Sequence, residues 1–102
     1  MSDHYNKLTP AEAERLAMLA EECAEVIQIV GKILRHGYDS CHPEGGEDNR
    51  TLLETEITDL RAVILVMVAC GDISSPRTRC VVDTWERKLQ YTHHQAADHE
   101  NG

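Results

Sequence analysis

The sequence predicts an all-α protein, and three observations support this fold class. Apolar residues recur at steps of three and four positions in long segments, which is the spacing of one helical face. Helix start and stop signals frame these segments, and no segment shows the apolar–polar alternation of a strand. The chain has 102 residues, enough for one domain. We therefore expect a single helical domain at residues 9–92, between a flexible N-terminus (1–8) and a flexible tail (93–102).

The first predicted helix spans residues 10–35. Thr9 provides an N-cap, Pro10 suits the first helical position, and Glu12 completes a capping box. Gly37 is a typical helix end. The face expected to point inward consists of Leu16, Leu19, Cys23, Val26, Val30 and Leu34, widened by Met18, Ile29 and Ile33.

Two further helices are predicted, at residues 50–70 and 76–91. Thr51 and Glu54 have the spacing of a second capping box, and Pro76 suits the start of the third helix. The second half of helix 50–70 is apolar nearly all round, so we expect it to be buried on most sides. The inner face of the third helix is expected to consist of Val81, Val82, Trp85 and Leu89.

The segment 36–49 between the first two helices contains several turn-forming residues and almost nothing to bury. A loop of this length in a small domain is usually either disordered or functional. The sequence alone leaves both alternatives open.

Three helices, one of them apolar on most sides, leave too much apolar surface for a monomer. Antiparallel pairing of the first two helices, completed by a second subunit, would cover this surface. We therefore expect a four-helix-bundle-like core formed by a homo-oligomer, either a dimer or a tetramer.

Charge and composition exclude several function classes. Eighteen acidic against ten basic residues give a net charge of −8, which argues against nucleic-acid binding because phosphate backbones require clustered basic residues. No apolar run approaches the length of a membrane-spanning helix, so we expect no membrane contact and a cytoplasmic location. The cysteines lack metal-binding or disulfide spacing, and Cys23 and Cys70 are expected to be buried.

The informative feature is a set of carboxylates that borders the apolar rows of two helices. Glu21, Glu22 and Glu25 form an E-E-x-x-E pattern in the first helix, and Glu56 and Asp59 form E-x-x-D in the second. Residues three and four positions apart share one side of a helix. If the two helices pair, these acids converge.

Converging carboxylates repel each other unless something compensates their charge. Divalent cations are the natural compensation, and a site made only of oxygen ligands suits Mg²⁺, with Mn²⁺ as a substitute. A di-iron bundle would require Glu-x-x-His pairs, which neither Glu22 nor Glu56 begins. Glutamates at this spacing also occur on solvated helix faces. The same pattern is therefore compatible with surface acids that bind no metal.

The two acidic motifs, with their surroundings, resemble the MazG-like all-α nucleoside triphosphate pyrophosphohydrolases. LAEECAEVIQ surrounds the first motif and LLETEITDLRAVI the second, and GKILRHGYDS is similar to short stand-alone members encoded by phages. The resemblance covers about residues 14–72. The thirty residues between Glu25 and Glu56 are a long separation for the family.

The resemblance implies Mg²⁺-dependent hydrolysis of a (d)NTP to (d)NMP and pyrophosphate, with two or three ions per site. The implied metal ligands are Glu22, Glu25, Glu56 and Asp59. Glu21 matches the first glutamate of the family motif and would bind an additional metal or orient the attacking water. Glu21 and Glu22 are thus the candidate catalytic residues.

Substrate contacts are expected from the end of the first helix, the loop and the start of the second helix. The similarity to phage members favours a purine deoxynucleotide such as dGTP and the cytoplasm of a bacterial host. The alternative is a non-catalytic helical module that binds nucleotide or a partner protein around a structural or regulatory metal cluster. The candidate substrate-binding residues are Lys32, Arg35 and Arg50 for the distal phosphates, His36 and Tyr38 for the base, and Asn49, which otherwise caps the second helix.

Overall fold

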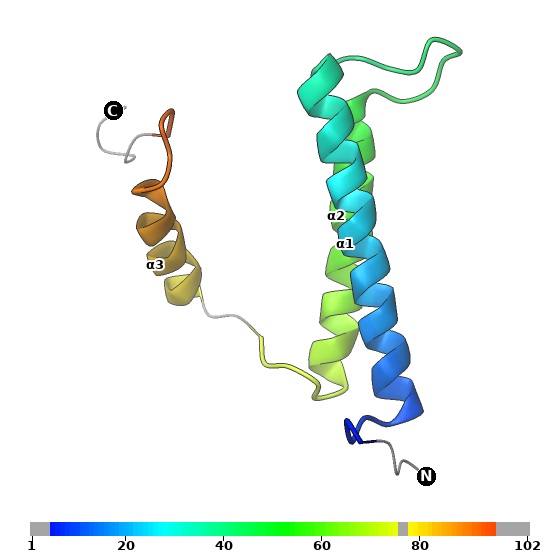
Figure 1. The fold of residues 1–102 in the computed structure, drawn as a ribbon, viewed down its shortest axis with the longest axis vertical. Coiled ribbons are helices and arrows are strands. Elements are labelled where there is room, and N and C mark those ends of the chain that lie inside the picture. Colours follow the sequence, from blue (N-terminus) through cyan, green and yellow to red (C-terminus); the bar gives the residue numbers. More distant parts are fainter. Residues whose placement is uncertain (1–4, 76–77, 96–102) are drawn as a thin grey trace.

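Three helices make up the regular structure of residues 5–75 and 78–95, which are the residues that this computed structural model describes. They are α1 (Pro10–His36), α2 (Asn49–Ala69) and α3 (Thr78–Leu89). Helices α1 and α2 form a long antiparallel hairpin, and α3 lies apart from it (Figure 1). The all-α prediction is confirmed for the described residues, none of which forms a strand.

The predicted helix boundaries are close to those observed. The predicted start of the third helix at Pro76 lies outside the described residues. So do residues 1–4 and 96–102 of the predicted flexible ends.

Helix α1 begins with the capping box that the sequence predicts. The backbone N–H of Glu12 donates to Thr9 Oγ1 at 3.1 Å, and the Thr9 N–H donates to Glu12 Oε1 at 2.8 Å. The helix ends at His36, and the N–H of Gly37 donates to the Ile33 carbonyl at 2.7 Å. Gly37 adopts φ 90° and ψ 168°, a conformation essentially restricted to glycine.

Replacing Gly37 by alanine is therefore expected to lower the free energy of unfolding by about 1–3 kcal/mol. Gly31→Ala is the matched control, because Gly31 is inside α1 and an added Cβ would lie 3.5 Å from Arg35 Nη1, an ordinary contact. This control is expected to raise the free energy of unfolding by about 0.5–1 kcal/mol. Denaturant titration followed by circular dichroism measures both effects, and equal effects of the two variants would contradict the prediction.

Helix α2 begins differently from the prediction. Its N-cap is Asp48, whose Oδ1 accepts the backbone N–H of Thr51 at 2.9 Å. The predicted capping box of Thr51 and Glu54 is wrong, since Thr51 already lies within the first turn. The hydrogen bond from Thr51 lowers the pKa of Asp48, because it stabilises the ionised carboxylate.

The hairpin is held by a narrow apolar contact and one ion pair. Ile29 of α1 and Val63 and Met67 of α2 are the buried apolar residues, and Met67 is only 2% exposed. At the open end of the hairpin, the Arg15 guanidinium contacts both carboxylate oxygens of Asp72, with Nη2–Oδ1 at 2.9 Å. This bidentate pair fixes the end of α2 against the first turns of α1 and lowers the pKa of Asp72.

Much of the predicted inner surface of the hairpin is exposed in the single chain. The predicted inner stripe of α1, and the apolar row through Ile57 on α2, lie on the other side of the α1–α2 contact from the carboxylates, as helical periodicity and the antiparallel arrangement require. Leu34 is 82% exposed, and Ile57 of α2 is 41% exposed. We call this surface the apolar face, and it comprises Leu16, Leu19, Cys23, Val26, Val30 and Leu34 of α1 with Leu53, Ile57, Leu60, Ile64 and Val68 of α2.

Further predictions of burial are wrong for this chain, among them that of Met18, which is 50% exposed. Cys23 is exposed because it lies on the apolar face, and Cys70 is exposed because it follows the last residue of α2. The second half of α2 buries only Val63 and Met67, while Leu65 and Val66 remain exposed. A single neighbouring helix can cover only one side of α2.

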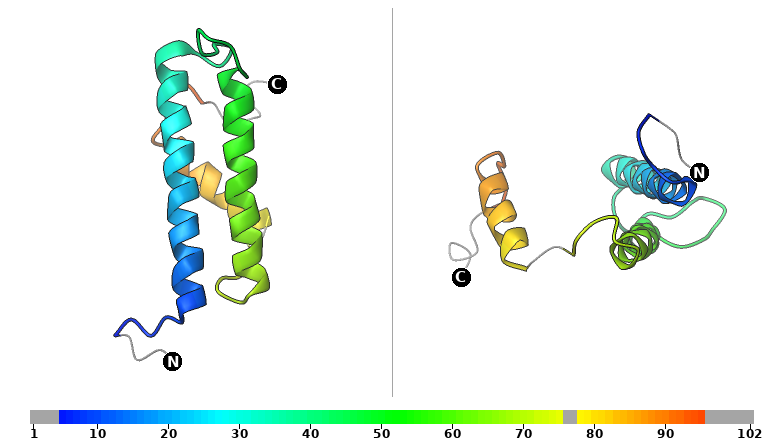
Figure 2. Two further views of the ribbon diagram at one scale, coloured as in Figure 1. Left: turned by 90° about the vertical axis from the view of Figure 1, so that its right-hand side faces the viewer. Right: turned by 90° about the horizontal axis from the view of Figure 1, so that it is seen from below.

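Helix α3 packs against neither α1 nor α2 within the described part of the chain. Its expected inner residues Val81, Val82 and Trp85 are exposed, contrary to prediction. The right-hand view of Figure 2 shows α3 well separated from the hairpin. The radius of gyration is accordingly 17.9 Å, against about 13 Å for a compact domain of this length. A single domain spanning residues 9–92 remains a prediction.

Among the described residues, no helix combines the length and the apolar character that crossing a membrane requires.

Candidate functional site

Four carboxylates from the two hairpin helices converge on one point. Glu22 and Glu25 lie one turn apart on α1, and Glu56 and Asp59 lie one turn apart on α2. One oxygen of each side chain lies within 4.8 Å of the corresponding oxygens of the other three. We call these four residues the carboxylate cluster. Antiparallel packing through Ile29 and Val63 places the acidic motifs of α1 and α2 at the same level along the hairpin axis.

The cluster raises the pKa of two of its members. Burial, followed by the charges of Glu25, Asp59 and Glu21, raises the pKa of Glu22. A hydrogen bond that the protonated carboxyl of Glu56 makes with Glu25 is the main cause that raises the pKa of Glu56, and burial adds to it. In the protein alone, each group thus resists ionisation, Glu22 mainly because it is partly buried and Glu56 mainly because its protonated form bonds to Glu25, and the negative neighbours add to both effects.

Two oxygen atoms of the cluster lack a partner in the described structure. Oε2 of Glu22 and Oε2 of Glu56 are buried, and neither has a hydrogen-bond partner there. Buried polar atoms are normally satisfied by a donor or by a bound ion. The donor set consists only of carboxylate oxygens from partly buried and exposed side chains, which fits Mg²⁺ or Mn²⁺.

The raised pKa values predict how pH affects the metal-free protein. For a carboxyl whose pKa is higher in the folded state than the usual 4.5, stability falls as pH rises through the folded value. In EDTA, the melting temperature is therefore expected to increase from about pH 7 to about pH 5, where Asp72 and Asp48 with their lowered pKa values stay ionised.

The control for this pH dependence is the double variant Glu22→Gln/Glu56→Gln. It removes the two carboxyl groups whose pKa is raised and leaves the histidines unchanged. A wild-type melting curve that shifts with pH by the same amount as that of the double variant would contradict the prediction.

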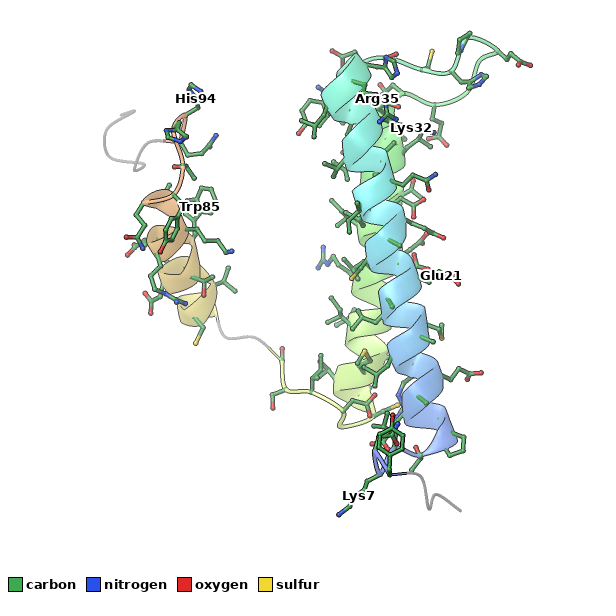
Figure 3. All side chains as sticks on the ribbon, in the orientation of Figure 1. Lys7, Glu21, Lys32, Arg35, Trp85 and His94 are labelled. Carbon is green, nitrogen blue, oxygen red and sulfur yellow. The ribbon has the colours of Figure 1, made fainter. Side chains whose placement is uncertain are left out.

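Glu21 lies outside the cluster. Its side chain is exposed, and it points away from α3 (Figure 3). Its charge nevertheless contributes to the raised pKa of Glu22. The structure therefore places four of the five predicted metal ligands together and leaves Glu21 beside them, in contact with solvent.

A small cavity opens from the cluster along α1. It has a volume of about 270 Å³. Gln28 was not among the predicted site residues, and its position one turn after Glu25 is the only signal that could have identified it. The residues that line this cluster cavity are Glu25, Gln28, Ile29, Lys32, Leu52 and Glu56.

The segment between α1 and α2 has a defined conformation, which is fixed by hydrogen bonds across its base. The Asn49 N–H donates to the Ser40 carbonyl and the Arg50 N–H to the Tyr38 carbonyl, both at 2.9 Å. Asn49 is 6% exposed, and its Nδ2 donates to the Gly37 carbonyl at 3.0 Å. Asn49 thus anchors the loop, as the first residue of α2 rather than as its cap.

This loop borders a second, larger cavity of about 460 Å³ at the end of α1. Four predicted substrate-binding residues line it: Lys32, Arg35, His36 and Asn49. Figure 3 shows Lys32 and Arg35 at the end of α1 nearest the loop. The remaining residues that line this loop cavity are Ser40, Cys41, His42, Pro43, Gly45, Gly46, Glu47 and Leu52.

The other two predicted substrate-binding residues lie elsewhere. Arg50 forms an ion pair with Asp39, and its guanidinium carbon lies 4.8 Å from the centre of the Tyr38 ring. Neither Arg50 nor Tyr38 lines the loop cavity or the cluster cavity. Both residues are engaged in holding the outer side of the loop.

Comparison with known proteins adds no relative: no protein-family model matches the chain, and neither do any curated proteins or solved structures.

Proposed function

We propose that this protein is a Mg²⁺-dependent nucleotide pyrophosphohydrolase that cleaves a (d)NTP between its α and β phosphates. Its products are a (d)NMP and pyrophosphate, and we expect a purine deoxynucleotide such as dGTP as substrate. The observation that carries the proposal is the carboxylate cluster, with two buried oxygens that lack a partner. The resemblance of both acidic motifs to the MazG-like enzymes supplies the reaction.

The residues of the cluster would hold two or three Mg²⁺ ions, which Mn²⁺ can replace. When bound, these cations would neutralise the phosphates and lower the pKa of the attacking water. Glu22, Glu25, Glu56 and Asp59 would provide the oxygen ligands. Glu21, exposed beside them, would orient the attacking water or accept its proton.

Lys32 complements the carboxylates with positive charge. It lines the same cavity as Glu25 and Glu56, and within the described residues it forms no ion pair. A lysine in this position would bind a phosphate oxygen of the substrate, since its ammonium group is a compact donor that is not already engaged in an ion pair.

A panel of the eight common nucleoside and deoxynucleoside triphosphates, each with Mg²⁺, tests the proposal. We expect pyrophosphate release from at least one purine nucleotide, and none when EDTA is added. If Mn²⁺ binds to the protein but none of the nucleotides yields pyrophosphate, the protein is instead a binding module with a structural or regulatory metal cluster.

We also propose that the active form is a homo-oligomer, a dimer or a tetramer, in which apolar faces of two hairpins pack together. The exposed apolar face spans both helices, and contiguous apolar surface of this kind typically marks an interface. The extended shape of the single chain supports this proposal, because α3 also leaves Trp85 exposed.

A further inference from the structure

We propose that the loop cavity binds the base and sugar of a nucleoside phosphate whose phosphates lie at the carboxylate cluster. This assignment rests on the proposed function for the position of the phosphates. It identifies the binding site for the rest of the substrate.

The two cavities differ in the space that they offer. The cluster cavity has about 270 Å³ and the loop cavity about 460 Å³. Sites for small organic ligands usually have about 300–1,000 Å³. The cluster cavity is thus below this range, whereas the loop cavity lies within it.

The two cavities are neighbours, because Lys32 and Leu52 line both of them. A ligand with phosphates at Glu25 and Glu56 can therefore extend past Lys32 into the space below the loop. Arg35 and His36 follow Lys32 along α1, so donors continue into the loop cavity.

The chemistry of the walls suits a flat heterocycle better than a second phosphate group. Leu52 and Pro43 offer apolar surface, and Gly45 and Gly46 present backbone without side chains. Arg35 provides donors and Glu47 provides an acceptor, and the edge of a nucleobase presents both carbonyl or ring acceptors and N–H donors. A bare phosphate would be attracted by Arg35 but repelled by the carboxylate of Glu47, whereas a nucleobase edge can bond to both.

A further polar group of the loop cavity is His42. Its Nδ1 accepts the backbone N–H of Glu44 at 3.1 Å. In the neutral ring the proton is then on Nε2, which makes His42 a donor in the cavity wall.

The loop that borders this cavity is already held in one conformation by hydrogen bonds. The hydrogen bonds from Asn49 and Arg50 to the loop carbonyls close its base, and Gly45 N–H donates to the His42 carbonyl at 2.8 Å. Binding to such a preorganised site avoids much of the entropic cost of ordering a loop.

The test measures binding of the four common nucleoside 5′-monophosphates to the full-length protein in the presence of Mg²⁺ by isothermal titration calorimetry. We expect measurable binding of at least one of them. Cys41→Trp fills the loop cavity and is expected to weaken this binding at least about tenfold. Glu47→Gln is expected to weaken it about three- to tenfold. Glu44→Gln, the same charge change in the same loop but outside the cavity lining, is expected to leave it unchanged.

Mn²⁺ titration and circular dichroism accompany each variant, and both are expected to match the wild type. Because Glu47→Gln replaces a cavity residue by one of similar size, it tests the assignment independently of any misfolding of Cys41→Trp.

Three outcomes would overturn the assignment: no binding of any monophosphate, equal binding to wild type and Cys41→Trp, or binding of inorganic pyrophosphate that Cys41→Trp abolishes while monophosphate binding persists. Monophosphate binding that Cys41→Trp abolishes, in a protein that hydrolyses no triphosphate, would support the cavity and contradict the proposed function. Pyrophosphate release that is unaffected in Cys41→Trp at low substrate concentration would support the proposed function and contradict the assignment of the loop cavity.

Discussion

Replacing Glu56 by glutamine is expected to lower Mg²⁺-dependent pyrophosphate release at least about a hundredfold, since even residues that only orient metal ligands change activity 10–100-fold. Glu56 faces Glu25 across the hairpin and contributes one of the two buried oxygens that lack a partner. Glutamine keeps the size of the side chain but provides one neutral oxygen in place of a carboxylate. Asp59→Asn and Glu22→Gln are expected to cause losses of the same order.

The matched control for this experiment is Glu54→Gln. Glu54 lies on the same helix two positions earlier, is exposed, and is not part of the carboxylate cluster. The same loss of charge there is expected to leave turnover close to that of the wild type. Rates measured with the preferred nucleotide from the substrate panel provide the comparison.

A second readout separates a chemical loss from unfolding. In EDTA, Glu56→Gln is expected to melt at a higher temperature than the wild type, because it removes a carboxylate whose neighbours are negative. With Mg²⁺ added, only the wild type is expected to gain substantially in melting temperature, since a ligand stabilises the state to which it binds. Full turnover in a folded Glu56→Gln protein would contradict the metal mechanism.

The carboxylate cluster could be predicted because its geometry depends on local spacing. Glu22 and Glu25 share one side of α1, and Glu56 and Asp59 share one side of α2 with Val63. Once two helices pair in antiparallel order, only one relative rotation buries Val63, and this rotation brings the acids together. The capping box at Thr9 was predictable for the same reason, since all its hydrogen bonds span three residues.

Which apolar row of α1 packs against α2 could not be derived in the same way. Two adjacent rows on α1 are apolar, one through Ile29 and one through Val30, and periodicity does not show which of them contacts α2. The structure packs the row of Ile29 against α2 and leaves Val30 exposed. Which row contacts which neighbour depends on how many helices surround α1, and the sequence of one chain does not contain this number.

The loop was also beyond prediction from sequence, because its anchors are not local. Asn49 donates to Gly37, twelve positions earlier, and Asn49 itself lines the loop cavity. Thr51 and Asn49 were the expected caps, whereas α2 begins at Asn49 with Asp48 as its N-cap. A segment with little to bury was thus ordered by polar contacts, which hydrophobic patterning cannot reveal.

Introducing a charge into the apolar face by Ile57→Asp is expected to dissociate the proposed oligomer. Ile57 lies in the row of Leu53, Leu60 and Ile64 on α2, and it remains 41% exposed in the single chain. A buried charge at the centre of an interface typically costs at least about 2 kcal/mol, which corresponds to a roughly thirtyfold rise in Kd. Sedimentation velocity over a dilution series measures the shift.

Leu65→Asp on the same helix distinguishes loss of this particular face from a general effect of added charge. Leu65 is more exposed, at 65%, but helical periodicity places it in the row of Glu54, Thr58 and Arg61, which faces away from α1. The wild-type mass is therefore expected for Leu65→Asp and the monomer mass for Ile57→Asp. A monomeric wild type would contradict the oligomer, whereas dissociation by Leu65→Asp alone would assign the contact to the outer side of α2. Because the carboxylates lie on the opposite side of the hairpin from Ile57, Mn²⁺ binding is expected to survive in the folded Ile57→Asp monomer, which would separate the metal site from the assembly that surrounds it.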